Sequence, residues 1–208
     1  MEIENFGYNI MTVGFIGASV LSGVIIWGLY KQNQKIWHSK SAESISVLYF
    51  SYAFFSVING IVYGLAADSL LIIATNSIYF FLYCGIFSGL YKFRGFSNQE
   101  KLFSLAYLAG IALMIFSEKK DLLLVIYCFG GYASMMKQIY EVIKNKSAGQ
   151  LEVRLFMIYW VSVTFWIMYS YGIRNYTYLG LCMTNFTLLT ISIILMIKYP
   201  APKMQEAI

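Results

Sequence analysis

Charge is scarce in this sequence, and the shortage excludes most soluble proteins. Only 12% of the 208 residues are charged, whereas 59% are hydrophobic, and the mean hydropathy is +0.64. Soluble domains carry about twice that share of charged residues, roughly 25%. The composition therefore predicts an integral membrane protein.

Residues that build metal centres and active sites are also few. The chain has one histidine, His38, and three cysteines, Cys84, Cys128 and Cys182. None stands at a metal-ligand or C-x-x-C spacing, and the sequence has no Walker-type glycine loop. We therefore expect no catalytic residues, no metal and no cofactor, and an integral-membrane enzyme is the least favoured class.

Seven charge-free stretches stand out along the chain. A helix rises about 1.5 Å per residue, so about 20 apolar residues cross a bilayer core of roughly 30 Å. Short connections between the stretches leave no room for a soluble domain, which argues against a nucleic-acid partner despite the net charge of +5. The stretches are Asn5–Tyr30, Ser44–Ala67, Ser69–Tyr91, Leu102–Ser117, Leu122–Met136 (which can continue past Lys137), Leu155–Ile173 and Asn175–Ile197.

Lysine and arginine fall mostly on one side of these spans. With the N-terminus outside, only Lys119, Lys120 and Arg174 lie on the outer side. Cytoplasmic loops carry the excess of positive charge, so we expect a cytoplasmic C-terminus and a basic face toward anionic lipid of the bilayer. A bacterial inner membrane is favoured, with an endolysosomal or plasma membrane as the alternative. The inner residues are Lys31, Lys35, Lys40, Lys92, Arg94, Lys101, Lys137, Lys144, Lys146, Arg154, Lys198 and Lys203.

The chain repeats itself at an offset of 106 residues. Lys31–Tyr63 matches Lys137–Tyr169 at 11 of 33 positions, where the biased composition would give roughly two or three by chance. Both copies run in the same direction, so an odd helix must separate them. We predict an all-α membrane protein of seven transmembrane helices, in which Leu102–Ser117 is an inverting linker between two parallel three-helix bundles (3+1+3), with units at 1–95, 96–120 and 121–208.

The repeat also carries a motif that resembles a known family. Gln32 is followed eight positions later by Lys40-Ser41-Ala42, and Gln138 eight positions later by Lys146-Ser147-Ala148. These look like the paired motifs of the PQ-loop superfamily, and the likeness within it is closest to the SWEET and SemiSWEET sugar transporters. Proton-coupled amino-acid exporters such as cystinosin and the KDEL receptor share the same motif pair.

The resemblance covers nearly the whole chain. Tyr63-Gly64 and the stretch Asp68–Asn76 are similar to the second and third helices of a SWEET repeat. Lys31 and Lys137 stand where the family usually has proline, so both copies lack the residue that would kink the helix. The glycines that could restore flexibility, or simply allow close packing, are Gly23, Gly28, Gly130 and Gly131.

The SWEET resemblance implies a substrate site built on an asparagine pair. Asn76 and Asn185 occupy corresponding places in the third and seventh spans, at an offset of 109. In the family such a pair faces across a central cavity and hydrogen-bonds the sugar. An amide offers two donors and an acceptor, which suits hydroxyls and also the ends of a zwitterion. The alternative is that each asparagine bonds the backbone of a neighbouring helix.

Four further residues complete the implied pocket. Ser56 and Gly60 share one face of the second span, and their repeat mates Ser162 and Trp166 share one face of the sixth. Trp166 could stack on the apolar face of a sugar ring, whereas Gly60 stands where the family has a second tryptophan, so we expect more room on that side. Ordinary helix packing is the alternative for both Trp166 and Gly60.

Two residue pairs are expected to act as gates. Tyr63 and Tyr169 are repeat mates that could close the outer end of the cavity or line it. Gln32 and Gln138 belong to the inner loops of the motif and could satisfy backbone groups where helix ends open and close.

Ionisable side chains are missing from the interior of the spans, and proton relays normally need one. We therefore expect a transporter that moves a small polar solute, with sugar as the leading class, by facilitated alternating-access uniport. The first alternative is a proton-coupled amino-acid or metabolite exporter. A sorting receptor of the KDEL type is less favoured, because no Arg or Lys lies within a span. The chain could act alone or as a homo-oligomer. Carboxylates at the span ends that could couple to protons are Glu43, Asp68, Glu141 and Glu152.

Overall fold

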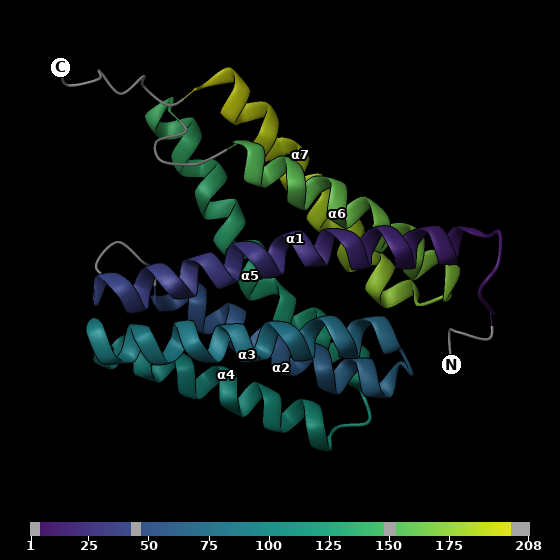
Figure 1. Ribbon diagram of the computed structural model, residues 1–208, viewed down its shortest axis with the longest axis horizontal. Helices are drawn as coiled ribbons and strands as arrows, with labels where there is room; N and C mark the ends of the chain where they lie inside the picture. Colours follow the sequence, from purple (N-terminus) through teal and green to yellow (C-terminus); the bar gives the residue numbers. More distant parts are fainter. Residues whose placement is uncertain (1–4, 43–46, 148–152, 201–208) are drawn as a thin grey trace.

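The structure is a computed structural model and describes residues 5–42, 47–147 and 153–200. Within these ranges the chain is all-helical, and no residue lies in a β-strand. The helices follow one another through short connections (Figure 1), with bounds α1 Ile10–Ser39, α2 Val47–Ala66, α3 Leu70–Phe93, α4 Asn98–Phe116, α5 Lys120–Asn145, α6 Val153–Gly172 and α7 Tyr176–Lys198.

Four of these helices, α1, α3, α4 and α7, are long and apolar enough to cross a membrane. The helix α2 contains a shorter apolar stretch, Phe50–Ala66. Large apolar side chains also face outward, such as Trp27 at 61%, Phe81 at 73% and Phe116 at 86% exposure. Side chains of this kind suit contact with lipid. The apolar helices and outward apolar side chains indicate an integral membrane protein. That all seven helices span the membrane remains a prediction.

Polar caps set where four of the helices begin. Asn9, Ser69, Ser97 and Asn175 each accept a hydrogen bond from a backbone N–H in the first turn of α1, α3, α4 and α7. At α4 the Glu100 side chain also reaches back to the Ser97 backbone, which completes a capping box. Such caps satisfy N–H groups that have no partner within the helix.

The helix α1 is longer than its charge-free stretch. It continues past Tyr30 to Ser39, so Gln32 and His38 lie inside the helix and not in an inner loop as expected. Lysine and glutamine are good helix formers, and a basic group in the last turn is favoured by the helix dipole. The end of the hydrophobic stretch therefore does not mark the end of the helix. The helix α5 likewise continues past Lys137, as expected, and ends at Asn145.

The repeat is also visible in the backbone. The non-glycine residues with positive φ, among those that the structure describes, form two pairs separated by 106 positions. Lys40 (49°) and Lys146 (46°) end α1 and α5, and Asp68 (49°) and Arg174 (56°) lie between the next two helices of each copy. A left-handed backbone is costly for side chains other than glycine, so its recurrence at matching places supports the duplication.

We group the helices by repeat copy, three in each, and in each group the third helix packs against the other two. The helix α3 contacts both α1 and α2, and α7 contacts both α5 and α6. Between the groups α1 packs on α6 and α2 packs on α5, which are equivalent contacts under the repeat. The helix α4 lies against α2 and α5. We call the two sets the α1–α3 group and the α5–α7 group.

The two ends of the molecule pack differently. At the N-terminal end, where residues 67–69, 117–119 and 173–175 join the helices, one buried cluster draws on both groups; we call it the end cluster. The other two buried clusters each stay within one group: one around Ile36 and Ile86 lies toward the opposite, C-terminal end of the α1–α3 group, and one around Cys182 and Leu189 lies along the first two thirds of α7 in the α5–α7 group. Figure 1 shows α5, α6 and α7 diverging from α1, α2 and α3 toward the C-terminal end.

Close approach of α1 and α6 depends on glycine. A Cβ added to Gly14 would collide with the backbone of Tyr169, and one added to Gly17 would collide with the ring of Phe165. By contrast, Gly23 and Gly28 have no neighbour within 4 Å of such a Cβ. Small residues let the backbones of membrane helices approach closely, so Gly14 and Gly17 set the contact between the groups.

We expect Gly14→Ala to lower the thermal stability of the purified protein in detergent. The added methyl meets backbone that cannot move aside, and overpacking of this kind costs about 1–3 kcal/mol. The matched control is Gly28→Ala, which should be neutral or stabilising by up to about 1 kcal/mol, because alanine is the better helix former. Equal melting temperatures for the two variants would contradict the importance of this contact.

Candidate substrate site and its closed end

Asn76 is the seventh residue of α3, and its amide is only partly used by the protein. Its Nδ2 donates to the Ile72 carbonyl oxygen of the same helix at 2.8 Å. The side chain is half-buried and lies directly against Gly60 of α2, where an added Cβ would meet the amide carbon and oxygen at 2.6 Å. The bond to its own helix leaves one amide hydrogen and the carbonyl oxygen of Asn76 available to a solute.

The sequence suggested spare room for a solute beside Gly60. In the structure this space is filled. Asn76 itself occupies the volume that a side chain at position 60 would need. The physical reason is that α2 and α3 approach closely along Gly60 and Gly64, the latter packing on Ile72 and Ile73. Gly60 thus allows close packing of α2 and α3 and positions Asn76.

Asn185 is the tenth residue of α7 and is half-buried. Within the part of the chain that the structure describes, its amide has no hydrogen bond to another group, and it does not bond Asn76. It is thus the freer of the two amides. Asn76 and Asn185 both lie in the half of their helices nearer the N-terminal end.

The two serines of the implied pocket are less available to a solute, since one hydroxyl bonds its own helix and the other side chain is buried. Ser56 Oγ donates to the Ala53 carbonyl oxygen at 2.8 Å in its own helix. Ser162 is buried, with 2% of its surface exposed. A hydroxyl that bonds its own helix backbone is a weaker solute ligand than a free amide, because binding a solute must compete with that bond.

Trp166 packs among aromatic rings next to the end cluster. It meets Tyr169 edge-on, with centroids 5.8 Å apart, and Tyr178 at the same separation. The side chain is half-buried, so part of its surface is not covered. The second tryptophan of α6, Trp160, is held by a hydrogen bond from Nε1 to Thr190 Oγ1 of α7 at 2.9 Å.

Tyr63 ties α2 to the α5–α7 group at the N-terminal end. It is 3% exposed, and its hydroxyl oxygen lies 2.8 Å from Asp121 Oδ1 of α5 and 3.0 Å from Asn175 Oδ1, the cap of α7. Its ring stacks on Tyr178, with centroids 6.1 Å apart and planes 16° apart. One phenolic hydrogen is shared between two acceptors, of which the carboxylate is the stronger.

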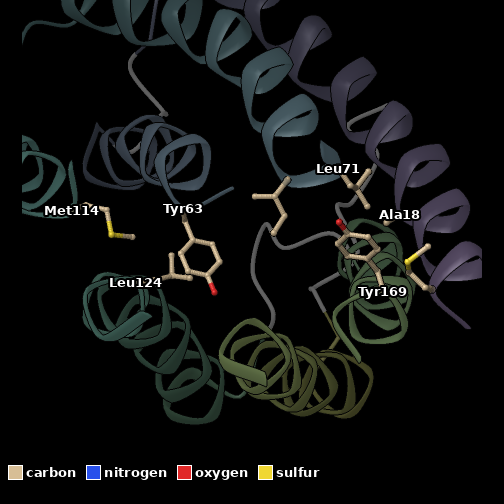
Figure 2. Packing of buried hydrophobic residues seen from close by; sticks show 8 residues of the cluster. Ala18, Tyr63, Leu71, Met114, Leu124 and Tyr169 are labelled. Atoms are coloured by element: carbon tan, nitrogen blue, oxygen red, sulfur yellow. The ribbon is translucent and has the colours of Figure 1, made fainter. Parts of the chain in front are cut away.

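Tyr169 makes the reciprocal contact from α6. It is fully buried, and its hydroxyl lies 2.6 Å from the hydroxyl of Ser69, the buried cap of α3. Its ring also meets Phe15 of α1 edge-on. Figure 2 shows Tyr169 beside Leu71 and Ala18 on one side of the end cluster, with Tyr63 beside Leu124 on the other.

The two tyrosine contacts are related by the repeat. Tyr63 and Tyr169 are 106 positions apart, and so are their partners Ser69 and Asn175. Each tyrosine reaches across to the cap of the third helix of the other group, so the two hydrogen bonds cross the interface in opposite directions. We call this arrangement the crossed tyrosine contacts. Sequence reasoning found the tyrosines and missed both caps and Asp121, although a cap-forming residue six positions after each tyrosine was a usable signal.

The remaining predicted residues are only partly covered by the described ranges. Gln32 is half-buried within α1. Gln138 and Glu141 belong to α5, but their side chains lie outside the described residues, as do Glu43 and Glu152 altogether. Asp68 lies in the turn between α2 and α3 at the closed end. No group of His, Cys, Asp and Glu able to hold a metal ion occurs in the described ranges.

The sequence matches no known family profile and no curated protein. Among solved structures, a eukaryotic SWEET transporter superposes with a TM-score of 0.71, over 91% of this chain and 96% of that one, at 12% sequence identity. The chain has the SWEET fold. The resemblance predicted from the motifs is thus confirmed at the level of fold, and the SWEET fold extends over both helix groups and α4.

Removal of the two phenolic hydroxyls, by Tyr63→Phe with Tyr169→Phe, should loosen the closed end. Each lost hydrogen bond is worth about 1 kcal/mol, so the pair should raise the population of the opened end about tenfold or more. A cysteine at Leu71, in a protein whose three native cysteines are replaced by serine, reports this as faster labelling by a membrane-impermeant maleimide.

The matched control is Tyr171→Phe, which removes a hydroxyl from a tyrosine of the same helix that is 58% exposed. Its labelling rate should equal that of the parent protein. Unchanged labelling in the double variant would show that the crossed tyrosine contacts do not hold this end closed.

Proposed function

We propose that the protein is a membrane transporter that moves a small polar solute, with sugar as the leading class, by alternating-access uniport. The observation that carries the proposal is the SWEET fold with one end closed by the crossed tyrosine contacts. In this proposal all seven helices span the bilayer. The α1–α3 and α5–α7 groups are the two moving bundles (3+1+3), and α4 is the linker that inverts the second.

The conformation supports this assignment. A single buried cluster joins the groups at the N-terminal end, whereas the other two buried clusters each stay within one group. Such a molecule can rock about the closed end without losing the packing inside either group, which is how two bundles alternate access to a site between them. The basic C-terminal end would face the cytoplasm.

Asn76 and Asn185 are the proposed solute ligands. Asn76 keeps a donor and an acceptor available, and Asn185 has its whole amide available. Together they can replace several of the hydrogen bonds that a hydroxylated solute gives up on leaving water. In this proposal Trp166 offers part of its ring to the apolar side of a sugar. Gly60 supports Asn76, and Ser56 and Ser162 lie behind the ligands on α2 and α6.

Uniport is favoured over proton coupling because the proposed site contains amides and rings and no ionisable ligand. Asp121 at the closed end accepts a hydrogen bond from the gate residue Tyr63 and not from the proposed ligands. A proton-coupled amino-acid or metabolite exporter is the alternative function. It would use carboxylates at the helix ends.

The proposal is tested by uptake into proteoliposomes at equal and unequal pH. The labelled solutes are glucose, sucrose and an amino-acid mixture. We expect sugar uptake that ignores the pH gradient. The Asn76→Ala plus Asn185→Ala variant should lose about tenfold or more in kcat/KM, because each lost solute hydrogen bond is worth about 1 kcal/mol. Thr187→Ala is the matched control, since Thr187 is an exposed residue of α7 that bonds its own backbone. Amino-acid flux that follows the pH gradient would overturn uniport.

The glutamine pair is proposed as a gate at the C-terminal end and not as a ligand. Gln32→Leu with Gln138→Leu should therefore lower the transport rate more than the apparent affinity. Initial rates over a range of sugar concentrations separate the two. A raised KM with an unchanged maximal rate would instead place these side chains on the solute.

A further inference from the structure

We propose that Asn59 of α2 is a further solute-binding residue, which contacts the solute only when the N-terminal end is open. The inference rests on the proposed alternating-access function. Asn59 would bind the solute on its way in from the N-terminal end. It would act in addition to Asn76 and Asn185, which would bind the solute in both access states.

The first observation is that the Asn59 side chain is buried without a partner. Only 1% of its surface is exposed, and both Nδ2 and Oδ1 lack a hydrogen bond in the described structure. An amide with two donors and an acceptor is costly to bury in this way, since its lost contacts with water are not replaced. Asn76 of the neighbouring helix, by contrast, bonds a backbone carbonyl.

The second observation is where α2 places this amide. Asn59 lies one turn before Tyr63 and two turns after Tyr52, so the three side chains share a face of the helix. Tyr63 bonds Asp121 of α5, and Tyr52 packs on Gly131 and stacks on Tyr127 of α5. Asn59 therefore lies toward α5, directly behind the contact that closes the N-terminal end.

The third observation is that the fold does not require an amide here. The repeat mate of Asn59 is Phe165, whose ring packs against Gly17 of α1 in the equivalent interface. An apolar side chain thus fills this position in one copy. The asparagine in the other copy stands next to Gly60, which itself lies against Asn76.

These observations fit a contact that exists only in the other access state. Opening the N-terminal end breaks the bonds of Tyr63 to Asp121 and Asn175 and separates α2 from α5. Asn59 is then uncovered on the path to Asn76 and can bond the hydroxyls of an incoming solute. Closing the end strips those bonds from Asn59 and buries the amide without a partner, so the amide favours return to the open state.

Asn59→Leu tests the inference, because leucine has a similar volume and no polar atoms. Uptake of labelled glucose is measured separately from each face of sided proteoliposomes, together with thermal stability in detergent. We expect the KM at the N-terminal face to rise about fivefold, the effect of one lost hydrogen bond. The KM at the opposite face should not change, and the melting temperature should rise. Phe165→Leu, at the repeat-related position, should change neither KM.

A KM that changes equally at both faces, or at neither, would overturn the inference while leaving the transport function intact. If the wild-type protein carries no glucose, the proposed function fails for that sugar, and a labelling experiment still decides the placement. Asn59→Cys, with the native cysteines replaced by serine, should react with an impermeant maleimide from the N-terminal face once Tyr63→Phe is added. Absence of that reaction would also overturn the inference.

Discussion

Two hydrogen bonds across the helix groups, the crossed tyrosine contacts, determine the conformation on which the rest of the structure depends. Tyr63 reaches the cap of α7, and Tyr169 reaches the cap of α3. Each cap oxygen also accepts a hydrogen bond from a backbone N–H in the first turn of its own helix. The same oxygen therefore caps one helix and fixes the position of the opposite group. Helix initiation and closure of the N-terminal end are thereby coupled, and the proposed site on Asn76 lies within two turns of that closure.

The duplication explains the symmetric part of this arrangement, and its departures explain the functional part. Equivalent helices make equivalent contacts, down to the paired left-handed lysines, because both copies inherited the same backbone. Within the second and sixth helices, the positions held by Asn59 and Gly60 in one copy are held by Phe165 and Trp166 in the other. The α1–α3 group thus carries amides at or beside these positions, Asn59 and Asn76, whereas the α5–α7 group carries rings that pack on the protein.

The sequence predicted the helical fold and its SWEET likeness because hydrophobic stretches and a long-range repeat are properties of the chain alone. It placed the end of α1 too early, since lysine and glutamine continue a helix as readily as leucine does. It also misjudged Gly60, because the space beside a glycine is decided by the neighbouring helix, here through Asn76. Asp121 was missed for the same reason, because a hydrogen bond between groups depends on how the groups pack. The two caps did carry a local signal, six positions after each tyrosine, but the sequence does not say which tyrosine each cap meets.

The uninterrupted length of α1 has a mechanical consequence. The helix runs for 30 residues without proline, and its contacts with α6 are made near its beginning, at Gly14 and Gly17. From Gly17 to Ser39 it extends about 33 Å beyond that fulcrum, at about 1.5 Å per residue. A stiff rod of this length acts as a lever arm: a tilt of about 10° at the glycine contact would displace its far end by roughly 6 Å. Small adjustments where the groups touch are thus converted into a wide movement at the basic end, with no hinge inside the helix.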